Sequence, residues 1–315
     1  MAIPLKTSDS VEITILVDNY TDSLLTGPRP GVRRPVLKHG WFLAAEHGLS
    51  LLIRVTSGGK TRSILMDTGV SDYALMYNAR EVGADIDAVE EIVLSHGHFD
   101  HVGSLIPLLR TSSCRLPVHL HPGAFVRRRK RNQDGVYTLL PTLNREEVAH
   151  AGAVLNLSEE PSLIADRTVL LTGEIDRVTP FEKGSPILEA ELNGSWALDP
   201  FHDDQSLVIH LKDKGLIVIS GCAHAGIVNS VQYTRKITGV ERIHAIIGGF
   251  HLSGSDLESV IKPTIAAIRE MNPGMVVPLH CTGWEAQVGF RNAMPDQFVL
   301  NSVGTRYTFG EEVTG

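Results

Sequence analysis

Short apolar runs alternate with segments of helical periodicity along most of the chain. Apolar runs of strand length occupy residues 11–17, 49–55, 63–66, 91–94, 117–121, 206–211, 216–220, 244–247 and 275–278. Apolar residues at helical spacing occupy residues 73–82, 102–109, 227–237 and 257–271. Strands that alternate with helices in this way predict an α/β fold.

The chain offers no linker at which it could be divided. Its 315 residues would allow two domains on length alone, but without a linker we expect one domain over residues 1–315. The least regular part lies at about 123–163. We interpret this segment as an insertion that covers or flanks a site, with plain surface elaboration as an equal alternative.

A basic cluster lies inside that segment and reads Arg127-Arg128-Arg129-Lys130-Arg131. We favour a solvated helix end or loop for it; the alternative is a contact to a phosphate or another anion near the site. The whole chain has a formal net charge of −7 and a pI near 6.0. This balance gives no support to general nucleic-acid binding.

Cysteine content and the N-terminal residues bear on the compartment. The three cysteines are few and odd in number, so they predict no disulfide framework. The N-terminal residues lack the apolar core of a signal peptide. No apolar run approaches the ~20 residues that a membrane-spanning helix needs. We therefore expect a cytoplasmic protein without membrane contact.

The densest chemistry follows the apolar run at 91–94 and reads His96-Gly97-His98-Phe99-Asp100-His101. Imidazole and carboxylate are ligands that suit zinc, iron and manganese. Alternate residues of an extended segment point the same way, so His96 and His98 can chelate one ion together. Asp100 and His101 then face a second position. A purely structural zinc site would be richer in cysteine, so the run predicts a two-metal site with a chemical role.

With this run, the chain resembles the metallo-β-lactamase superfamily, in a branch of dihydropterin ribofuranosyl-aminobenzene phosphate synthase-like hydrolases. The further motifs that carry the resemblance are Glu46-His47-Gly48-Leu49-Ser50, Asp67-Thr68-Gly69, Gly173-Glu174-Ile175, Asp203-Asp204-Gln205, Ser220-Gly221-Cys222-Ala223-His224-Ala225-Gly226, Gly248-Gly249-Phe250-His251 and His280-Cys281-Thr282-Gly283. The resemblance implies an α/β/β/α sandwich with metals at one edge. It also implies a small-molecule substrate and allows a homodimer.

The superfamily pattern also implies the remaining ligands. His280 matches its final histidine and would join Asp100 and His101 on the second metal. His224 lies in a glycine-flanked turn, whose small residues let the backbone approach a metal closely. We favour His224 as the third ligand of the metal held by His96 and His98, with a donor behind the ligands as the alternative.

Several polar residues near these motifs keep more than one interpretation. Cys222 stands where many relatives have an aspartate, so it could bridge the metals, although a buried apolar thiol is the favoured interpretation. Asp203 and Asp204 could ligate a metal, orient a ligand histidine or cap a turn, and His202 is an alternative ligand. His251 or His47 could face the substrate or donate a proton; otherwise each is a core histidine.

The favoured function is a metal-dependent hydrolase of a small substrate, with phosphorylated and pterin-like compounds among the candidates. Two divalent ions, zinc by default and manganese or iron as alternatives, would lower the pKa of a bridging water. Asp100 would orient the resulting hydroxide, and His251 or His224, whichever is not bound to metal, would protonate the leaving group. The alternatives are a mononuclear iron oxidoreductase on the same scaffold and a non-catalytic metal-binding sensor.

Overall fold

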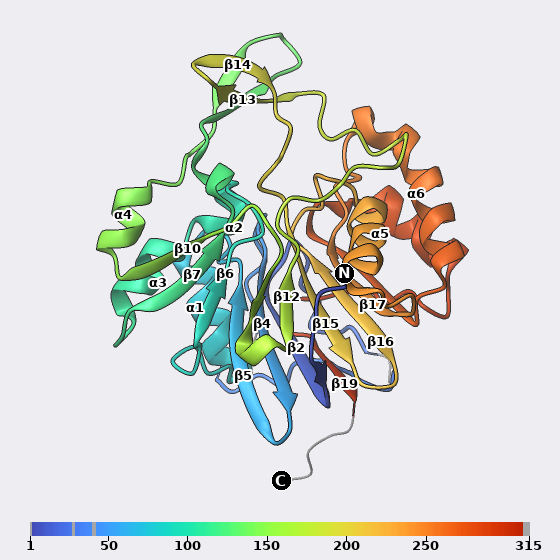
Figure 1. Cartoon of the computed structure of the whole chain (residues 1–315). Helices are drawn as coiled ribbons and strands as arrows, with labels where there is room; N and C mark the ends of the chain where they lie inside the picture. Colours follow the sequence, from blue (N-terminus) through green and yellow to red (C-terminus); the bar gives the residue numbers. More distant parts are fainter. Residues whose placement is uncertain (1, 27–28, 40–41, 311–315) are drawn as a thin grey trace.

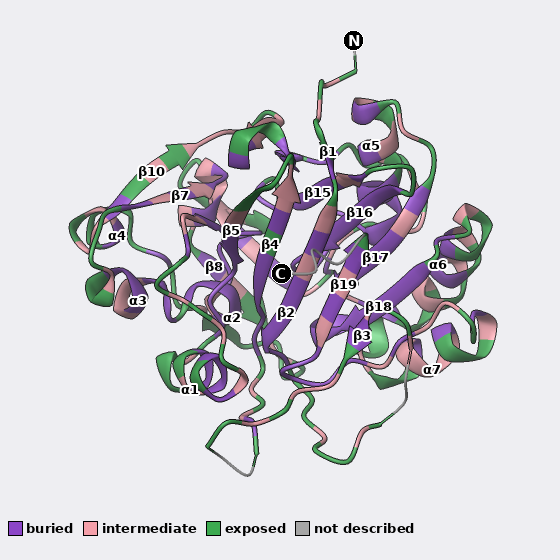
Figure 2. Cartoon of the chain, turned by 90° about the horizontal axis from the view of Figure 1, so that it is seen from below, coloured by how far each residue is buried: buried purple, intermediate pink, exposed green. Residues whose placement is uncertain are grey.

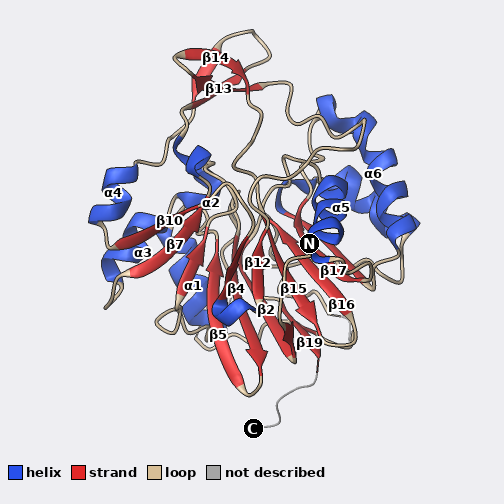
Figure 3. Ribbon diagram, viewed as in Figure 1, coloured by secondary structure: helices blue, strands red, loops and turns tan. Residues whose placement is uncertain are grey.

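Two β-sheets pack face to face, and helices cover the outer face of each sheet (Figures 1 and 3). The computed structural model describes residues 2–26, 29–39 and 42–310. The four layers are those of the expected α/β/β/α sandwich. Among the described residues no helix is both long and apolar enough to span a bilayer. The division of the chain into domains stays a prediction.

The larger sheet contains most of the N-terminal half together with the last strand. Its order is β10 (Ala153–Leu157), β7 (Leu116–Leu120), β6 (Glu91–Val93), β5 (Lys60–Met66), β4 (Ser50–Ser57), β2 (Ser10–Val17), β19 (Arg306–Gly310) and β3 (Val32–Arg33). Strands β5, β6, β7 and β10 run parallel to one another, and β5 is antiparallel to β4. The helices of this half are α1 (Asp72–Val82), α2 (Phe99–Val102), α3 (Leu105–Thr111) and α4 (Arg145–His150).

The second sheet contains most of the C-terminal half. Its order is β11 (Ser162–Ile164), β12 (Val169–Leu171), β15 (Ser206–Leu211), β16 (Gly215–Ser220), β17 (Ile243–Gly249) and β18 (Met275–Leu279), with β1 (Thr7–Ser8) paired to β15. Strands β16, β17 and β18 are parallel. The helices α5 (Ile227–Thr238), α6 (Glu258–Met271) and α7 (Trp284–Ala293) cover its outer face.

Three apolar layers hold the sandwich together, because most strands are buried on both faces (Figure 2). Between the sheets, Ile13 and Ile53 share one cluster with Ile209 and Ile217. Each of these side chains is 0 % exposed, and full burial of an isoleucine contributes about 1.5–3 kcal/mol. The nine predicted runs are all strands in the structure, and their apolar character matches burial on both faces. Strands β1, β3, β10, β11, β12 and β19 were not predicted.

Helix α1 shows how local sequence sets an element's limits. Ser71 caps its start, with Oγ accepting a hydrogen bond from the backbone N–H of Ala74 at 3.2 Å. Gly83 ends it in the left-handed region at φ 67°, a conformation that glycine adopts without steric cost. The predicted helix at 102–109 is instead divided into α2 and α3, which leave Gly103 and Ser104 between them.

A small third sheet projects from the sandwich, at the top of Figure 1. Its order is β14 (Ser195–Leu198), β13 (Leu188–Leu192), β8 (Arg128–Arg131) and β9 (Tyr137–Leu139). Part of the segment at about 123–163 thus builds this sheet with residues from much later in the chain. The rest, α4 and β10, belongs to the larger sheet's layer. The basic cluster is a strand and not a helix end or loop.

Candidate metal centre

Four parallel strands from the two sheets end at one edge of the sandwich, and the candidate site residues follow them. The run from His96 to His101 follows β6, with Asp100 and His101 on the short helix α2. His224 lies between β16 and α5, His251 follows β17, and His280 follows β18. The sequence therefore brings ligands separated by more than a hundred residues to one place by ending parallel strands at a common edge.

His96, His98 and His224 form the first ligand group. Their ligand nitrogens all lie within 4.8 Å of one another, and Nε2 of His224 is 3.1 Å from Nδ1 of His98. All three side chains are buried. Among the described residues, Nε2 of His96 and Nε2 of His98 have no hydrogen-bond partner. A buried nitrogen without a partner is costly, so this donor set fits a metal ion that prefers imidazole.

Asp100, His101 and His280 form the second ligand group. Nε2 of His101 and Nε2 of His280 are 3.1 Å apart. Oδ2 of Asp100 lies 3.4 Å from Nε2 of His280 and 3.8 Å from Nε2 of His101. His47 reaches the same carboxylate oxygen from the exposed side, with Nε2 at 3.4 Å. One carboxylate oxygen facing converging imidazole nitrogens also fits a divalent metal.

Buried hydrogen bonds fix the orientation of the second group. Asp67 accepts at Oδ2 from Nδ1 of His101 at 2.7 Å, which directs Nε2 of that ring toward the site. Nδ1 of His280 lies 3.1 Å from Oδ1 of Asn19. The backbone N–H of His280 donates to Oδ1 of Asp18 at 2.8 Å. Asp18 and Asn19 follow β2, so the larger sheet also holds the final histidine in place.

The turn that carries the first group is held by a buried ion network. The backbone N–H of Gly97 donates to Oδ2 of Asp203 at 2.8 Å. Arg128 donates to Oδ1 of the same Asp203 and to Oδ2 of Asp199, each at 2.6 Å. The side chain of Arg128 is only 4 % exposed. Asp203 thus holds the backbone of the chelating turn at Gly97, and the choice among its three predicted roles stays a prediction.

This network changes the interpretation of the basic cluster. Arg128 binds two buried carboxylates, and Arg129 pairs with Glu189 at 2.6 Å. Each guanidinium group thus already has a carboxylate partner within the chain. The structure does not support the expectation that they form a phosphate site.

Burial and neighbouring charge shift the pKa values of both groups. Burial, with a contribution from Arg128, lowers the pKa of His98 to about 3. Burial also holds the pKa of His96 and of His224 well below the usual value. These imidazoles are neutral near pH 7, as metal ligation requires. His101 differs, because Asp67 and Asp100 outweigh its burial and raise its pKa to about 9.

Asp100 stays ionised despite its burial. Burial alone would raise the pKa of its carboxyl group, but His101 and His280 beside it hold that pKa well below the usual range. Asp204 behaves in the opposite way, because burial raises its pKa to about 7. Its Oδ2 accepts from the backbone N–H of Ala225 at 2.8 Å, so Asp204 braces the turn that carries His224.

Cys222 is a buried free thiol close to both groups. Its Sγ lies 3.2 Å from Nε2 of His101. Its sulfur and the ligand nitrogens of His96 and His101 all lie within 4.8 Å of one another. The position suits a ligand as well as a buried thiol, so both interpretations of Cys222 stay open. His202, the alternative ligand, instead bonds to Glu174.

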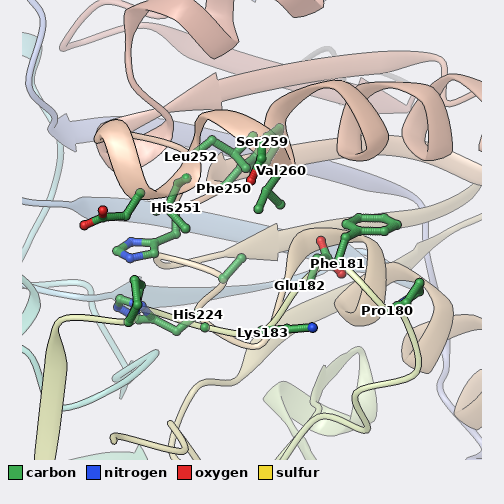
Figure 4. Close-up of a pocket in the computed structure, with 16 residues that line it drawn as sticks. Pro180, Phe181, Glu182, Lys183, His224, Phe250, His251, Leu252, Ser259 and Val260 are labelled. Carbon is green, nitrogen blue, oxygen red and sulfur yellow. The ribbon is translucent and has the colours of Figure 1, made fainter.

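His251 lies beside the first group and opens onto a cavity. Its ring centroid is 4.1 Å from that of His224, and its Nδ1 is buried with no hydrogen-bond partner among the described residues. Figure 4 shows the two rings at one end of the cavity, with Pro180 and Phe181 toward the other. Its volume is about 350 Å³.

The cavity wall has apolar and polar parts. Phe250, Leu252 and Val260 form the apolar part together with Phe181, and Lys183 and Asp256 contribute charged groups. Glu182 does not offer a free carboxylate to a ligand, because it accepts from the backbone N–H groups of Val228 and Asn229 at the start of α5.

Backbone strain gathers at the same edge of the sandwich. Asp67, Ala223, His251 and His280 all have positive φ, between 44° and 59°. A residue with a side chain in this left-handed region costs of order 1 kcal/mol. The hydrogen bonds around Asp67 and His280 offset that cost.

Comparison with known proteins identifies the family. The family model of the metallo-beta-lactamase superfamily matches residues 44–226, and the chain belongs to that superfamily. It is 34% identical over 260 residues to a 7,8-dihydropterin-6-methyl-4-(beta-D-ribofuranosyl)-aminobenzene-5'-phosphate synthase of Methanocaldococcus jannaschii, covering 81% of this chain and 87% of the relative.

Solved structures agree with this assignment. A crystal structure of a metal-dependent hydrolase of the beta-lactamase superfamily has a TM-score of 0.74 and 27% identity, covering 96% of this chain and 100% of that one. A metallo-beta-lactamase fold protein from Bacillus subtilis, 11% identical, has a TM-score of 0.50 over 96% of this chain and 100% of its own. The fold is therefore the metallo-β-lactamase fold, as the sequence motifs predict.

Sequence reasoning gave no role to several residues that support the site. Asp67, Asp18 and Asn19 each follow an apolar run, and a polar residue at a strand's carboxyl end was the available signal. Arg128 carried no comparable signal, because its partners Asp199 and Asp203 are distant in sequence.

Proposed function

We propose that this protein is a metal-dependent hydrolase that cleaves a small substrate with a metal-activated water. The observation that carries the proposal is the pair of buried ligand groups, of which the first reaches a cavity through His224. His96, His98 and His224 would hold one ion, and Asp100, His101 and His280 would hold the second. When bound, the two ions supply a polarised electrophile and a water of lowered pKa.

The chain's own residues supply orientation and proton transfer. Asp100 stays a carboxylate, so Oδ2 can accept a hydrogen bond from the attacking water and direct it toward the substrate. His251 has an unpartnered Nδ1 and lines the cavity beside His224. From there it would give a proton to the leaving group. His47 is exposed at the other side of Asp100 and would contact substrate there.

The cavity suggests what the substrate carries. Its wall of Phe181, Phe250, Leu252 and Val260 would take an apolar or ring-bearing group next to His251. The relative named for a dihydropterin ribofuranosyl phosphate product supports ring-bearing and phosphorylated candidates.

We include zinc as the metal and the cytoplasm as the location in this proposal.

The test combines metal content with turnover. Untagged protein and its His98→Ala and His280→Ala variants would be analysed by plasma mass spectrometry. We expect close to two zinc or manganese ions per wild-type chain and a lower content in each variant. Phosphodiesters, phosphomonoesters, thioesters and lactones with ring-bearing groups would then be assayed, with His98→Ala as the inactive control.

Two results would contradict the proposal. One iron ion per chain, unaffected by His280→Ala, would favour the mononuclear oxidoreductase. Two ions per chain without turnover of any substrate class would favour the metal-binding sensor.

A further inference from the structure

The small sheet presents one face of large side chains that the sandwich does not cover. Tyr137 is 40% exposed, Leu139 59% and Leu198 63%. The sheet projects away from both large sheets (Figure 1). Exposed apolar side chains gathered on one rigid surface are typical of an interaction site.

One row across this face has a regular chemical order. Register pairs Leu198 with Glu189, Glu189 with Arg129, and Arg129 with Leu139. Residues that are directly paired across strands lie on the same face of a sheet. The row from β14 to β9 therefore reads apolar, acidic, basic, apolar.

Contacts within the face hold its charged members in place. Nη2 of Arg129 is 2.6 Å from Oε2 of Glu189. The same guanidinium lies 3.8 Å from the ring centroid of Tyr137 and 4.4 Å from that of Trp196. The hydroxyl of Tyr137 donates to Oε1 of Glu189 at 3.1 Å. Ordered Tyr, Trp and Arg side chains are the residues that dominate interface energies, because little entropy remains to be lost on binding.

The order of the row is complementary to itself. A two-fold axis parallel to the strands, passing between β13 and β8, would place each β8 opposite the partner's β13. Arg129 would then face the partner's Glu189, and Leu139 would face the partner's Leu198. Arg127 and Glu191, whose charged atoms are 2.6 Å apart, lie two residues along the chain from Arg129 and Glu189. They repeat the arrangement of a basic residue beside an acidic one. No like charges of this row oppose each other in that arrangement.

We propose that this face is a homodimer interface, with a second copy of the chain as its occupant. A strongly acidic partner would attract the arginines of β8 but repel the glutamates of β13, and a strongly basic partner would do the reverse. A second copy places opposite charges against both strands. The face is small beside the 20 to 30 residues per side of a standard stable interface. We therefore expect a reversible dimer with a Kd in the micromolar range.

The test is sedimentation equilibrium of the metal-loaded full chain from about 1 to about 200 µM, which spans a micromolar Kd. We expect wild type to shift from monomer to dimer over this range. Arg129→Glu and Glu189→Lys should each weaken the homodimer at least about tenfold, because each places like charges opposite one another. An equimolar mixture of these two variants should associate again, since each restores the opposite charge for the other.

Two further variants control for folding and for location. Lys130→Glu changes an exposed charge on the opposite face of β8 and should leave dimerisation unchanged. Leu139→Asp alters a side chain that is 59% exposed, so it should weaken the dimer without loss of fold. Circular dichroism and metal content would confirm that each variant is folded.

Three results would overturn the proposal. They are a wild-type monomer at every concentration, a dimer that none of the variants on this face weakens, and a failure of the mixed charge variants to associate. The proposal does not depend on the hydrolase function, because mass and metal content are measured separately from turnover.

Discussion

The carboxylate of Asp67 and the imidazole of His101 form a fully buried pair, with Oδ2 2.7 Å from Nδ1. Asp67 also accepts from the backbone N–H of Ser95 at Oδ1, at 2.7 Å. The pair therefore links the end of β5 to the helix that carries His101. Because Nδ1 is engaged, His101 presents Nε2 toward His280.

Replacement of this carboxylate should weaken the second metal selectively. Asp67→Asn keeps an acceptor for Ser95 but removes the charge beside His101. We expect the affinity for the second ion to fall about 10- to 100-fold, while the first ion binds almost as before. Competition with a chromophoric chelator measures both steps. Asp166→Asn, at an exposed carboxylate, is the control, and equal loss at both steps would contradict a role in orienting His101.

The guanidinium of Arg128 should matter more for stability than its exposed neighbour does. Arg128→Met leaves the buried carboxylates of Asp199 and Asp203 without their partner, which costs about 3–5 kcal/mol. Arg127→Met removes a pair whose arginine side chain is 57% exposed, which costs less than about 1 kcal/mol. Urea unfolding of metal-free protein gives both values, and similar losses in the two variants would refute the distinction.

Asp204 should make stability depend on pH in an unusual direction. Its pKa rises from an ordinary value of 3.8 to about 7 in the folded chain because it is buried. The folded state thus holds this proton more tightly, so its stabilising contribution is complete below the ordinary pKa and is lost as pH rises through 7.

The variant Asp204→Asn isolates this effect, since the amide oxygen can still accept from Ala225. Between about pH 5 and about pH 8, metal-free wild type should lose about 2–3 kcal/mol of unfolding free energy relative to Asp204→Asn. Urea titrations of both proteins across this range measure the difference. A constant difference would show that Asp204 does not titrate there.

Cobalt substitution should decide between the two interpretations of Cys222. Its Sγ lies 3.2 Å from Nε2 of His101, so we expect a thiolate-to-cobalt absorption band in the loaded protein. The band should vanish in Cys222→Ser and persist in Cys114→Ser, where an exposed thiol is removed. Absence of the band in wild type would leave Cys222 as a buried apolar thiol.

Nine strands of the two large sheets could be predicted because they carry apolar runs, whereas β1, β3, β10, β11, β12 and β19 lie outside the predicted runs. The small sheet could not be predicted, since its strand β8 is Arg-Arg-Lys-Arg and gains its contacts from ion pairs and aromatic rings. Helix α7 also escaped prediction, because only Ala286 and Phe290 on it are buried. Two buried positions are too few for a clear periodic signal.

The candidate ligands could be predicted because four of them lie in one short run. The groups that orient them could not, because each meets its partner across a long stretch of chain. Asp67 is 34 residues from His101, and Arg128 is 75 residues from Asp203. Local pattern carries no information about such pairings until the sheets are packed.

The division of the ligands between the two sheets has a consequence for folding kinetics. His98 and His224 are 126 residues apart, and His101 and His280 are 179 apart. Contacts of such long range form late, after both sheets have docked. A metal ion would therefore find its full set of ligands only after the rate-limiting step. It should slow unfolding strongly while leaving the rate of folding nearly unchanged.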